Sequence, residues 1–232
     1  METRNVEISA LKTLRGGFLY LLVAVIVGIV DALAGLFSII AALGFMPAAP
    51  HKHSAFAGVI GAVAIVLVLS LVAVSIMLYA IFGKIRPGMR QLSEVDNGFR
   101  ISYTGTTLML VGLIILVLGL VVFAITILTS LYFTSPTVAS GGFMLALGVI
   151  IIGGIIAFIG NILTFVVGAF KLHSRYQNSL YMAAGILFIL DIALLLVGFS
   201  GILSLVGYIL MYIALGDTIN KPSTAAATPA QA

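Results

Sequence analysis

Long runs of apolar residues alternate with short polar segments along the whole chain. The runs cover residues 18–45, 56–83, 104–133, 143–170 and 180–216. A helix needs roughly 20 apolar residues to cross the hydrocarbon core of a bilayer, which is about 30 Å thick. Each of the first four runs can therefore form one membrane-spanning helix, and the pattern predicts an all-α fold.

The fifth run is too long for a single span, because residues 180–216 would form a helix of about 55 Å. Near its middle lies the turn-like sequence Gly-Phe-Ser-Gly at 198–201. A turn there divides the run into spans at 180–197 and 202–217, so that the chain forms a polytopic transmembrane bundle of six helices. The alternative is one long bent helix and a bundle of five.

The basic residues are distributed asymmetrically between the two sides of this bundle. Ten of the 11 Lys and Arg residues fall on segments of one side, and only Lys52 falls on the other. The ten are Arg4, Lys12, Arg15, Lys84, Arg86, Arg90, Arg100, Lys171, Arg175 and Lys221. Cytoplasmic segments of membrane proteins carry such an excess of Lys and Arg. The asymmetry predicts a multi-pass protein of the cell membrane with both termini in the cytoplasm.

This topology divides the chain into three parts. Residues 1–17 form a cytoplasmic N-terminal segment, residues 18–217 a transmembrane helical domain, and residues 218–232 a cytoplasmic tail. The tail is rich in Ala, Thr and Pro and is predicted to be disordered. The apolar run at 18–45 is much longer than the 7–15 apolar residues of a cleaved signal peptide. We therefore expect the N-terminal segment to be retained.

The longest polar connection between two spans covers residues 84–103. It mixes Lys and Arg with Glu94 and Asp96, and it contains the dipeptide Pro87-Gly88. Because Pro and Gly interrupt a helical pattern, we expect a loop here that faces lipid headgroups.

Composition supports a membrane environment. Hydrophobic residues make up 62% of the chain and charged residues 8%, against roughly 45–50% and about 25% in soluble domains. So few charges cannot cover the surface of a soluble globule, and the lipid bilayer is the expected partner. The net charge of +4 lies almost wholly on one side, which favours anionic lipid headgroups over nucleic acid.

The sequence offers little for catalysis or cofactor binding. It contains no Cys, which excludes thiol nucleophiles and thiolate metal sites. The neighbouring His51 and His53 have no acidic residue on their side of the membrane to complete a metal site. Nucleotide-binding and hydrolase motifs are also missing. We expect no enzyme activity, no cofactor and no metal.

Small and polar residues recur at helical spacing in three of the predicted spans. Lipid tails provide no hydrophobic force between helices, so small residues that allow close approach mark packing faces. We interpret these positions as helix-packing faces, within the chain, in a homo-oligomer or in a larger membrane complex. They are Ala24, Gly28, Gly35 and Ser38 in the first span, Gly112 and Gly119 in the third, and Gly154, Ala157 and Gly168 in the fourth.

Two acidic residues, Asp31 and Asp191, lie within predicted spans. An ionised Asp at the bilayer centre costs roughly 2.5–3.5 kcal/mol on insertion scales, and such residues usually face the bundle interior. One interpretation is a pair of protonated carboxyls that form hydrogen bonds across helix interfaces. The other is a proton- or cation-binding pair, with Asn161, Thr126 or Tyr208 as its partners.

Three helix hairpins share a rough pattern. Each begins with a basic residue and small or polar residues before the apolar run. Each return helix ends with apolar residues and a glycine or alanine, followed by a charged residue. The starts lie at Arg15, Arg100 and Arg175, and the ends at 78–84, 167–171 and 212–217. The pattern indicates either one hairpin repeated three times or the ordinary preference of membrane helices for charges at their ends.

The same features carry a resemblance to a known family. They are the basic, Leu-Tyr-led first helix, the junction Phe-Lys-Leu at 170–172, and the sequence Tyr-Ile-Ala-Leu-Gly-Asp at 212–217. On these features the chain resembles an uncharacterised family of small archaeal multi-pass membrane proteins across most of residues 10–220. That family is a domain of unknown function, so the resemblance implies a protein class and brings no activity or catalytic residue.

Function is predicted only at the level of class. The small-residue faces favour a non-enzymatic integral membrane protein that serves as a structural or accessory subunit, or as a homo-oligomer. The alternative is a small proton- or cation-coupled transporter or channel that uses Asp31 and Asp191.

Overall fold

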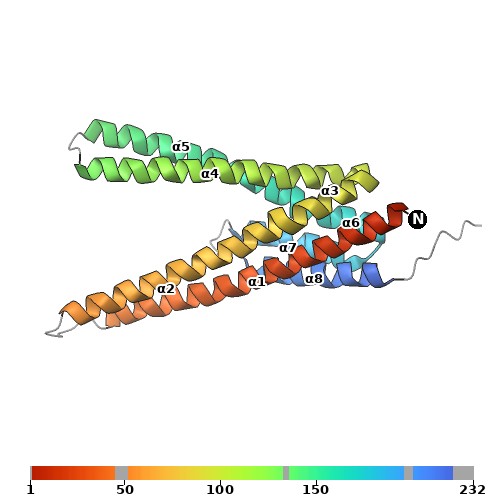
Figure 1. Ribbon diagram of the computed structural model, residues 1–232, viewed down its shortest axis with the longest axis horizontal. Coiled ribbons are helices and arrows are strands. Elements are labelled where there is room, and N and C mark those ends of the chain that lie inside the picture. The colour runs from red at the N-terminus through yellow and green to blue at the C-terminus, as the bar shows by residue number, and fades with distance from the viewer. Residues whose placement is uncertain (1, 45–51, 133–135, 196–200, 222–232) are drawn as a thin grey trace, which may run out of the picture.

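The computed structural model describes residues 2–44, 52–132, 136–195 and 201–221, and these are helical apart from a few turn positions (Figure 1). No strand occurs among the residues in these ranges. The elements are α1 (Glu2–Gly44), α2 (Lys52–Leu78), η1 (Tyr79–Ile85), α3 (Arg86–Val95), η2 (Asn97–Phe99), α4 (Arg100–Tyr132), α5 (Pro136–Asn161), η3 (Ile162–Val167), α6 (Gly168–Tyr176), α7 (Ser179–Leu195) and α8 (Ile202–Asn220). Segments η1 and η3 are π-helical, and η2 is a single 3₁₀ turn.

The prediction of an all-α bundle of six helices is confirmed. Segments α2, η1 and α3 continue one another as a single rod, and α5, η3 and α6 do the same. With α1, α4, α7 and α8 the described chain therefore contains six rods, five of which are long and apolar enough to cross a membrane. The sixth, α7, has 17 residues and extends about 26 Å.

The fifth apolar run is divided into two helices, as the Gly-Phe-Ser-Gly sequence predicted. Helix α7 ends at Leu195 and α8 begins at Ile202. Directly before α8, Gly201 has a φ of 97°, a left-handed conformation that glycine adopts without the steric penalty of a Cβ atom. Positions 198–200 of the predicted turn lie outside the described residues, as do His51 and the predicted disordered tail from residue 222 onward.

The expectation of a loop at residues 84–103 is wrong, because most of this segment is helical. Pro87 lies in the first turn of α3, where a missing backbone N–H is tolerated. The π-helical segment η1 precedes it, and the Arg86 amide donates to the Ile81 carbonyl five residues back. This wider π turn carries the chain past Pro87 without ending the helix.

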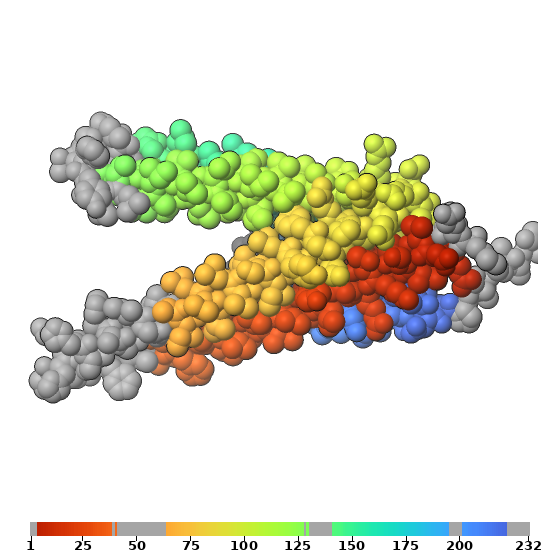
Figure 2. Space-filling view, in the orientation of Figure 1, coloured from red at the N-terminus to blue at the C-terminus, as the bar shows by residue number. Residues whose placement is uncertain are grey.

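The six rods form three hairpins that meet at one end of the molecule. Arm A consists of α1 and α2, arm B of α4 and α5, and the terminal hairpin of α7 and α8. Figure 1 shows both arms leaving the end that holds the N-terminus and diverging toward their tips, and Figure 2 shows the open wedge between them. Contacts between the arms run mainly through α3 and η1 against α4, while α8 packs on α1 and α7 on η3 and α6.

We call the end where the hairpins meet the basic end. It holds the first turns of α1, the short helices α3 and α6, and the last turns of α8 (Figure 1). Eight of the 11 Lys and Arg residues lie on these segments or at the start of α4, and two more lie next to them: Lys84 in η1 directly before α3, and Lys221 directly after α8. The remaining one, Lys52, begins α2 at the tip of arm A. The charge asymmetry predicted from the sequence is therefore an asymmetry of the folded molecule.

The buried core lies near the basic end and is shared by all three hairpins. Its largest fully buried side chains are Leu14, Phe18, Leu21, Ile85, Met89, Leu92, Phe99, Leu172, Tyr181, Met211 and Leu215. The outer parts of the arms are different, because Phe37 and Leu71 are each 67% exposed and Met144 is 73% exposed. Helices that are apolar on their exposed faces are typical of contact with lipid, so the arms indicate association with a membrane.

Arms A and B share one plan. In each, a long helix is followed by a second long helix, a π-helical segment and a short helix at the basic end. In each, a glycine of the first helix packs against that π segment or its end. A methyl group on Gly17 would lie 2.7 Å from Cγ1 of Ile85, and one on Gly105 would lie 2.8 Å from the Thr164 amide nitrogen. The common plan agrees with a repeat of these two hairpins, and a threefold repeat stays a prediction.

Candidate functional site

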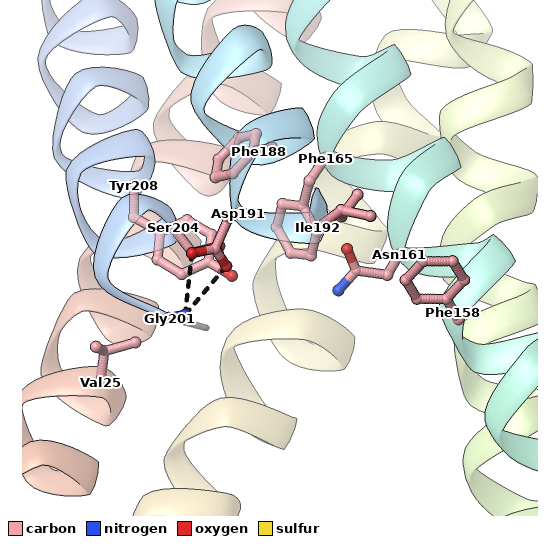
Figure 3. Close-up of a pocket in the computed structure, with 10 residues that line it drawn as sticks. All are labelled: Val25, Phe158, Asn161, Phe165, Phe188, Asp191, Ile192, Gly201, Ser204 and Tyr208. Atoms are coloured by element: carbon pink, nitrogen blue, oxygen red, sulfur yellow. Dashed lines mark hydrogen bonds between the residues drawn. The ribbon is translucent and has the colours of Figure 1, made fainter. Parts of the chain in front are cut away.

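A cavity of about 250 Å³ lies where the three hairpins come together (Figure 3). Its walls come from both arms and from the terminal hairpin. The lining residues are Val25 of α1, Phe158 and Asn161 of α5, Phe165 of η3, Phe188, Asp191 and Ile192 of α7, and Gly201, Ser204 and Tyr208 at the start of α8. The cavity therefore depends on the packing of five separate elements.

Asp191 is the acidic residue of this cavity, and it is 9% exposed. Its two carboxylate oxygens accept the Gly201 amide at 3.0 and 3.1 Å, and its Oδ2 accepts the Ser204 hydroxyl at 2.6 Å. The left-handed conformation of Gly201 starts α8 at this point, so the free amide at the helix start meets the carboxylate of α7. The positive N-terminal end of a helix stabilises a negative charge there.

An aromatic cluster underlies the carboxylate. Phe165 is its centre, with ring centroids 5.6 Å from Tyr208, 5.8 Å from Phe188 and 6.1 Å from Phe18. Phe188 and Tyr208 are themselves 5.4 Å apart. Tilted and edge-on pairs of this kind are favoured by the ring quadrupoles. The cluster connects α1, η3, α7 and α8, and the rings of Phe165, Phe188 and Tyr208 also line the cavity.

The charges around the cavity are unbalanced. Among its described lining residues, Asp191 is the sole carboxylate and no Lys, Arg or His is present. The partners of the carboxylate are a backbone amide and a hydroxyl, which are neutral donors. Asn161 also lines the cavity (Figure 3), and its amide makes no hydrogen bond to the described part of the chain. This arrangement can hold a proton or a cation.

The other predicted aspartate, Asp31, lies elsewhere. Its Oδ2 accepts a hydrogen bond from Ser70 of α2, so this contact lies inside arm A. Its Oδ1 is buried and has no partner among the described residues. Asp31 does not line the cavity. The structure thus gives the two aspartates separate partners on separate hairpins.

The predicted partners of the aspartates are divided in the same way. Asn161 and Tyr208 line the cavity with Asp191, as proposed from the sequence. Thr126 does not, because it lies in arm B and donates to the Val122 carbonyl of its own helix at 2.8 Å. The role of any of these residues in proton or cation binding stays a prediction.

Three of the predicted packing residues, Gly112, Gly119 and Ala157, lie at a very close helix contact in arm B. A methyl group on Gly112 would lie 2.3 Å from the Ala157 amide nitrogen, and one on Gly119 would lie 3.0 Å from the Ile150 amide nitrogen. From the opposite helix, a methyl group on Gly153 would lie 2.6 Å from the Leu116 amide nitrogen. Backbones at this distance leave room for hydrogen atoms only. Small residues at these positions are therefore required for the observed contact.

Several other predicted packing residues have more space. A methyl group on Gly28 or Gly154 would meet no atom within 4 Å, and one on Gly35 would reach only Val66 Cγ2 at 4.0 Å. The remaining three predicted positions differ from one another. Ala24 is buried, at 6% exposed, and a methyl group on Gly168 would lie 3.1 Å from Met89 Cε. Ser38 donates a hydrogen bond to the Ala34 carbonyl of its own helix at 2.7 Å. A packing role for the open positions needs a partner beyond the described residues of this chain.

Sequence reasoning missed the two hydroxyls that bind the aspartates. Ser70 is a lone hydroxyl in a run of aliphatic residues, and Ser204 follows Gly201 by three positions. Both signals are weak, because a Ser in a membrane helix ordinarily donates to a carbonyl of its own helix. Ser75 does so, to the Leu71 carbonyl at 2.7 Å.

Sequence reasoning also missed an ion-pair network at the basic end. Arg175 of α6 donates to Glu7 of α1 at 2.8 Å and to Asp96, which follows α3, at 2.7 Å. The Tyr176 hydroxyl donates to the same Glu7 oxygen at 2.6 Å, and the Asp96 side chain accepts the Gly98 amide at 2.8 Å. The network connects arm A to the short helix that follows arm B.

The network lowers the pKa values of both of its carboxyl groups. Burial raises the pKa of Glu7, but hydrogen bonds from Arg175 and Tyr176 outweigh burial and lower it overall. The Gly98 amide and then Arg175 lower the pKa of Asp96. Burial and the bond to Glu7 raise the pKa of Tyr176. Both carboxyls are therefore held in their ionised form at neutral pH.

Comparison with known proteins gives one match. The model of a family described as "Protein of unknown function (DUF973)" matches residues 7–232. No curated protein and no solved structure matches the chain. The resemblance inferred from the helix-end sequences is confirmed, and an archaeal origin stays a prediction.

Proposed function

This chain belongs to the DUF973 family, and we propose that it acts in the membrane as a non-enzymatic structural or accessory subunit, or as a homo-oligomer. The observation that carries the proposal is the wedge between arms A and B (Figure 2). Among the described residues, the two apolar hairpins contact each other mainly near the basic end, so their outer parts pack within each arm and not across the wedge. In a bilayer this space is filled by lipid or by the helices of another chain.

The open glycines support a partner helix. Gly28, Gly148 and Gly154 leave free space where a side chain would stand. Glycine in a helix costs roughly 0.5–1 kcal/mol relative to alanine, and close helix contact is the ordinary compensation in membranes. In arm B that compensation is visible at Gly112 and Gly153. The open positions would gain it through contact with a second copy or another subunit.

The hydrogen bonds of the aspartates also support a structural role. Asp31 joins α1 to α2 through Ser70, and Asp191 joins α7 to the start of α8. Each carboxyl thus connects neighbouring helices. This is the behaviour expected of polar residues that stabilise helix contacts inside a membrane.

The proposal includes an orientation in which the basic end lies in the cytoplasm, following the excess of Lys and Arg there. Cysteine labelling tests it, because the chain has no native Cys. A Cys introduced at Ser93 in α3 should be protected from an impermeant thiol reagent in intact cells, whereas a Cys at Ser54 should be labelled. The reverse labelling pattern would place the basic end outside.

Site-specific photo-crosslinking tests the subunit role. Ile151 lies within one helical turn of both Gly148 and Gly154 and is 57% exposed. Ile189 is 46% exposed on α7, where Gly185 already packs against Phe170. A photoreactive residue at 151 should give an adduct of defined mass in native membranes, and the same residue at 189 should not. A lack of adducts at both positions, with a monomeric chain in nanodiscs, would contradict the proposal.

A second candidate function is proton- or cation-coupled transport, which the cavity at Asp191 favours. Asp191→Asn keeps the shape and the acceptor oxygen but removes the charge. In proteoliposomes, cation or proton flux should then disappear in a folded variant, while Asp31→Asn separates the contribution of the other aspartate. Unchanged flux in a folded double Asn variant would exclude transport through these carboxyls.

A further inference from the structure

We propose that the cavity at Asp191 is a binding site for a small organic monocation that carries an ammonium group. This inference depends neither on the subunit role nor on transport, since a membrane subunit and a transporter could each use such a site. It rests on the charge, the walls and the size of the cavity. Each of these features points to a different property of the ligand.

The charge of the cavity calls for a single positive charge. A buried carboxylate without a cationic partner is costly in a medium of low dielectric constant. The donors from Gly201 and Ser204 lower this cost but bring no formal positive charge. None of the described lining residues is a Lys, Arg or His. One monovalent cation would balance Asp191.

The walls favour an organic cation. Phe165, Phe188 and Tyr208 line the cavity near Asp191, and Phe158 lines it on the far side, beyond Asn161 (Figure 3). Aromatic rings attract cations through their quadrupole, and ammonium groups are the ligands that aromatic cages commonly bind. A metal ion such as Ca²⁺ instead requires six to eight oxygen ligands. The described residues also contain no group of three or more His, Cys, Asp or Glu that could hold a metal ion.

Size and polarity give the remaining constraints. A volume of about 250 Å³ is far larger than one water molecule, whose share of liquid volume is about 30 Å³. Asn161 lies on the opposite wall from Gly201 (Figure 3), and its amide is free to bond a hydroxyl or N–H of the ligand. A compact ammonium compound with a short polar arm meets both conditions.

Binding can be measured on the purified full chain in lipid nanodiscs by isothermal titration calorimetry. The probes are choline and 3,3-dimethylbutan-1-ol, a neutral compound of the same shape in which carbon replaces the ammonium nitrogen. We expect saturable binding of choline and at least tenfold weaker binding of the neutral compound. Asp191→Asn should weaken choline binding at least tenfold, which corresponds to about 1.4 kcal/mol.

Asp31→Asn is the matched control, because it makes the same chemical change in a residue outside the cavity. It should leave choline binding unchanged. Equal binding of both probes would show an apolar cavity without charge recognition, and unchanged binding in Asp191→Asn would show a site elsewhere. Either result would overturn the proposal, as would competition by equimolar sodium, which would indicate an inorganic ion site.

A second variant covers the case in which Asp191→Asn does not fold. Phe188 lines the cavity beside Asp191 (Figure 3), and Phe188→Leu removes its aromatic face but keeps an apolar side chain there. It should weaken choline binding several-fold and leave binding of the neutral compound unchanged. An equal loss for both probes would mean that Phe188 contributes contact area alone, and would contradict an aromatic cation site.

Discussion

Arms A and B follow the same plan, but their helices are held together in different ways. In arm B, α4 and α5 approach so closely that a methyl group on Gly112 or Gly153 would lie within 2.7 Å of backbone atoms of the other helix. Near the basic end, α1 makes glycine contacts with the segments that follow α2, at Gly17 and Gly88, but the nearest atoms there are side-chain carbons of Ile85 and Leu14. Farther along, Gly28 has open space and Asp31 bonds to Ser70.

The difference shows two solutions to one physical problem. Helices in lipid gain nothing from hydrophobic exclusion, so they associate by close backbone packing or by polar bonds between side chains. Arm B uses the first solution along most of its length. Arm A combines close packing near the basic end with the hydrogen bond between Ser70 and Asp31 nearer its tip. Its glycine at position 28 stays open for contact with another helix.

The largest effect should come from adding one methyl group to arm B. In Gly112→Ala the new Cβ would lie 2.3 Å from the Ala157 amide nitrogen, and a backbone cannot move aside as a side chain can. The helices must separate, at a cost of about 1–3 kcal/mol. Unfolding in mixed micelles, followed by circular dichroism, measures the change.

The controls make the same substitution where space is open. Gly154→Ala in arm B and Gly28→Ala in arm A should leave stability unchanged or raise it by about 0.5–1 kcal/mol, because alanine favours helix. These variants separate packing from helix propensity. A loss at Gly28 as large as that at Gly112 would mean that both arms pack alike, in contrast to the structure.

A smaller effect should follow from removing the polar bond of arm A. Ser70→Ala takes away the donor to Asp31, and interhelical hydrogen bonds in membranes average about 0.6 kcal/mol, with a maximum near 1.7. We expect a loss in this range in the same unfolding assay. Ser75→Ala is the control, because Ser75 bonds within its own helix. Equal losses for the two variants would show that the Asp31 bond contributes nothing specific.

The same comparison shows how far the sequence could predict the fold. The lengths of the apolar runs and the turn-like sequence at 198–201 were sufficient to predict the six helices, because the thickness of the bilayer fixes the length of a span. The spacing of Gly112 and Gly119 identified the packing face of α4. On α5 the predicted Gly154 has open space, whereas the adjacent Gly153 makes the contact. Two neighbouring glycines lie on different faces, and spacing alone cannot tell which face meets a partner.

The candidate site was predictable in part for a similar reason. Asp191 stood out because a carboxyl in an apolar run is costly. Asn161 and Tyr208 were two of the three suggested partners, and the third, Thr126, lies in arm B away from the cavity. Ser204 depends on how α8 starts after Gly201, which is a matter of backbone conformation. The pairing of Glu7 with Arg175 joins residues from opposite ends of the chain, and no local pattern encodes it.

The smallest expected change in stability concerns the ion-pair network near the basic end, where Arg175 forms ion pairs with Glu7 and Asp96. Both carboxyls have pKa values below their ordinary values of 4.5 and 3.8. The unfolded chain therefore takes up protons at a higher pH than the folded chain, so the network stabilises the fold above about pH 4.5. This contribution should be lost as the pH falls through the lowered pKa values. Because these side chains are partly exposed, we expect at most about 1 kcal/mol.

Arg175→Gln should remove this contribution at neutral pH and flatten the fall in stability below pH 4.5. Arg90→Gln is the control, since its pair with Glu94 is 3.4 Å long and its two side chains are 67% and 59% exposed. That variant should match the wild type at every pH. Stability measured by chemical unfolding at pH 7 and at steps below pH 4.5 compares the three proteins. An unchanged acid dependence in Arg175→Gln would mean that the arms are joined by the buried core alone, and that the network is a consequence of their contact.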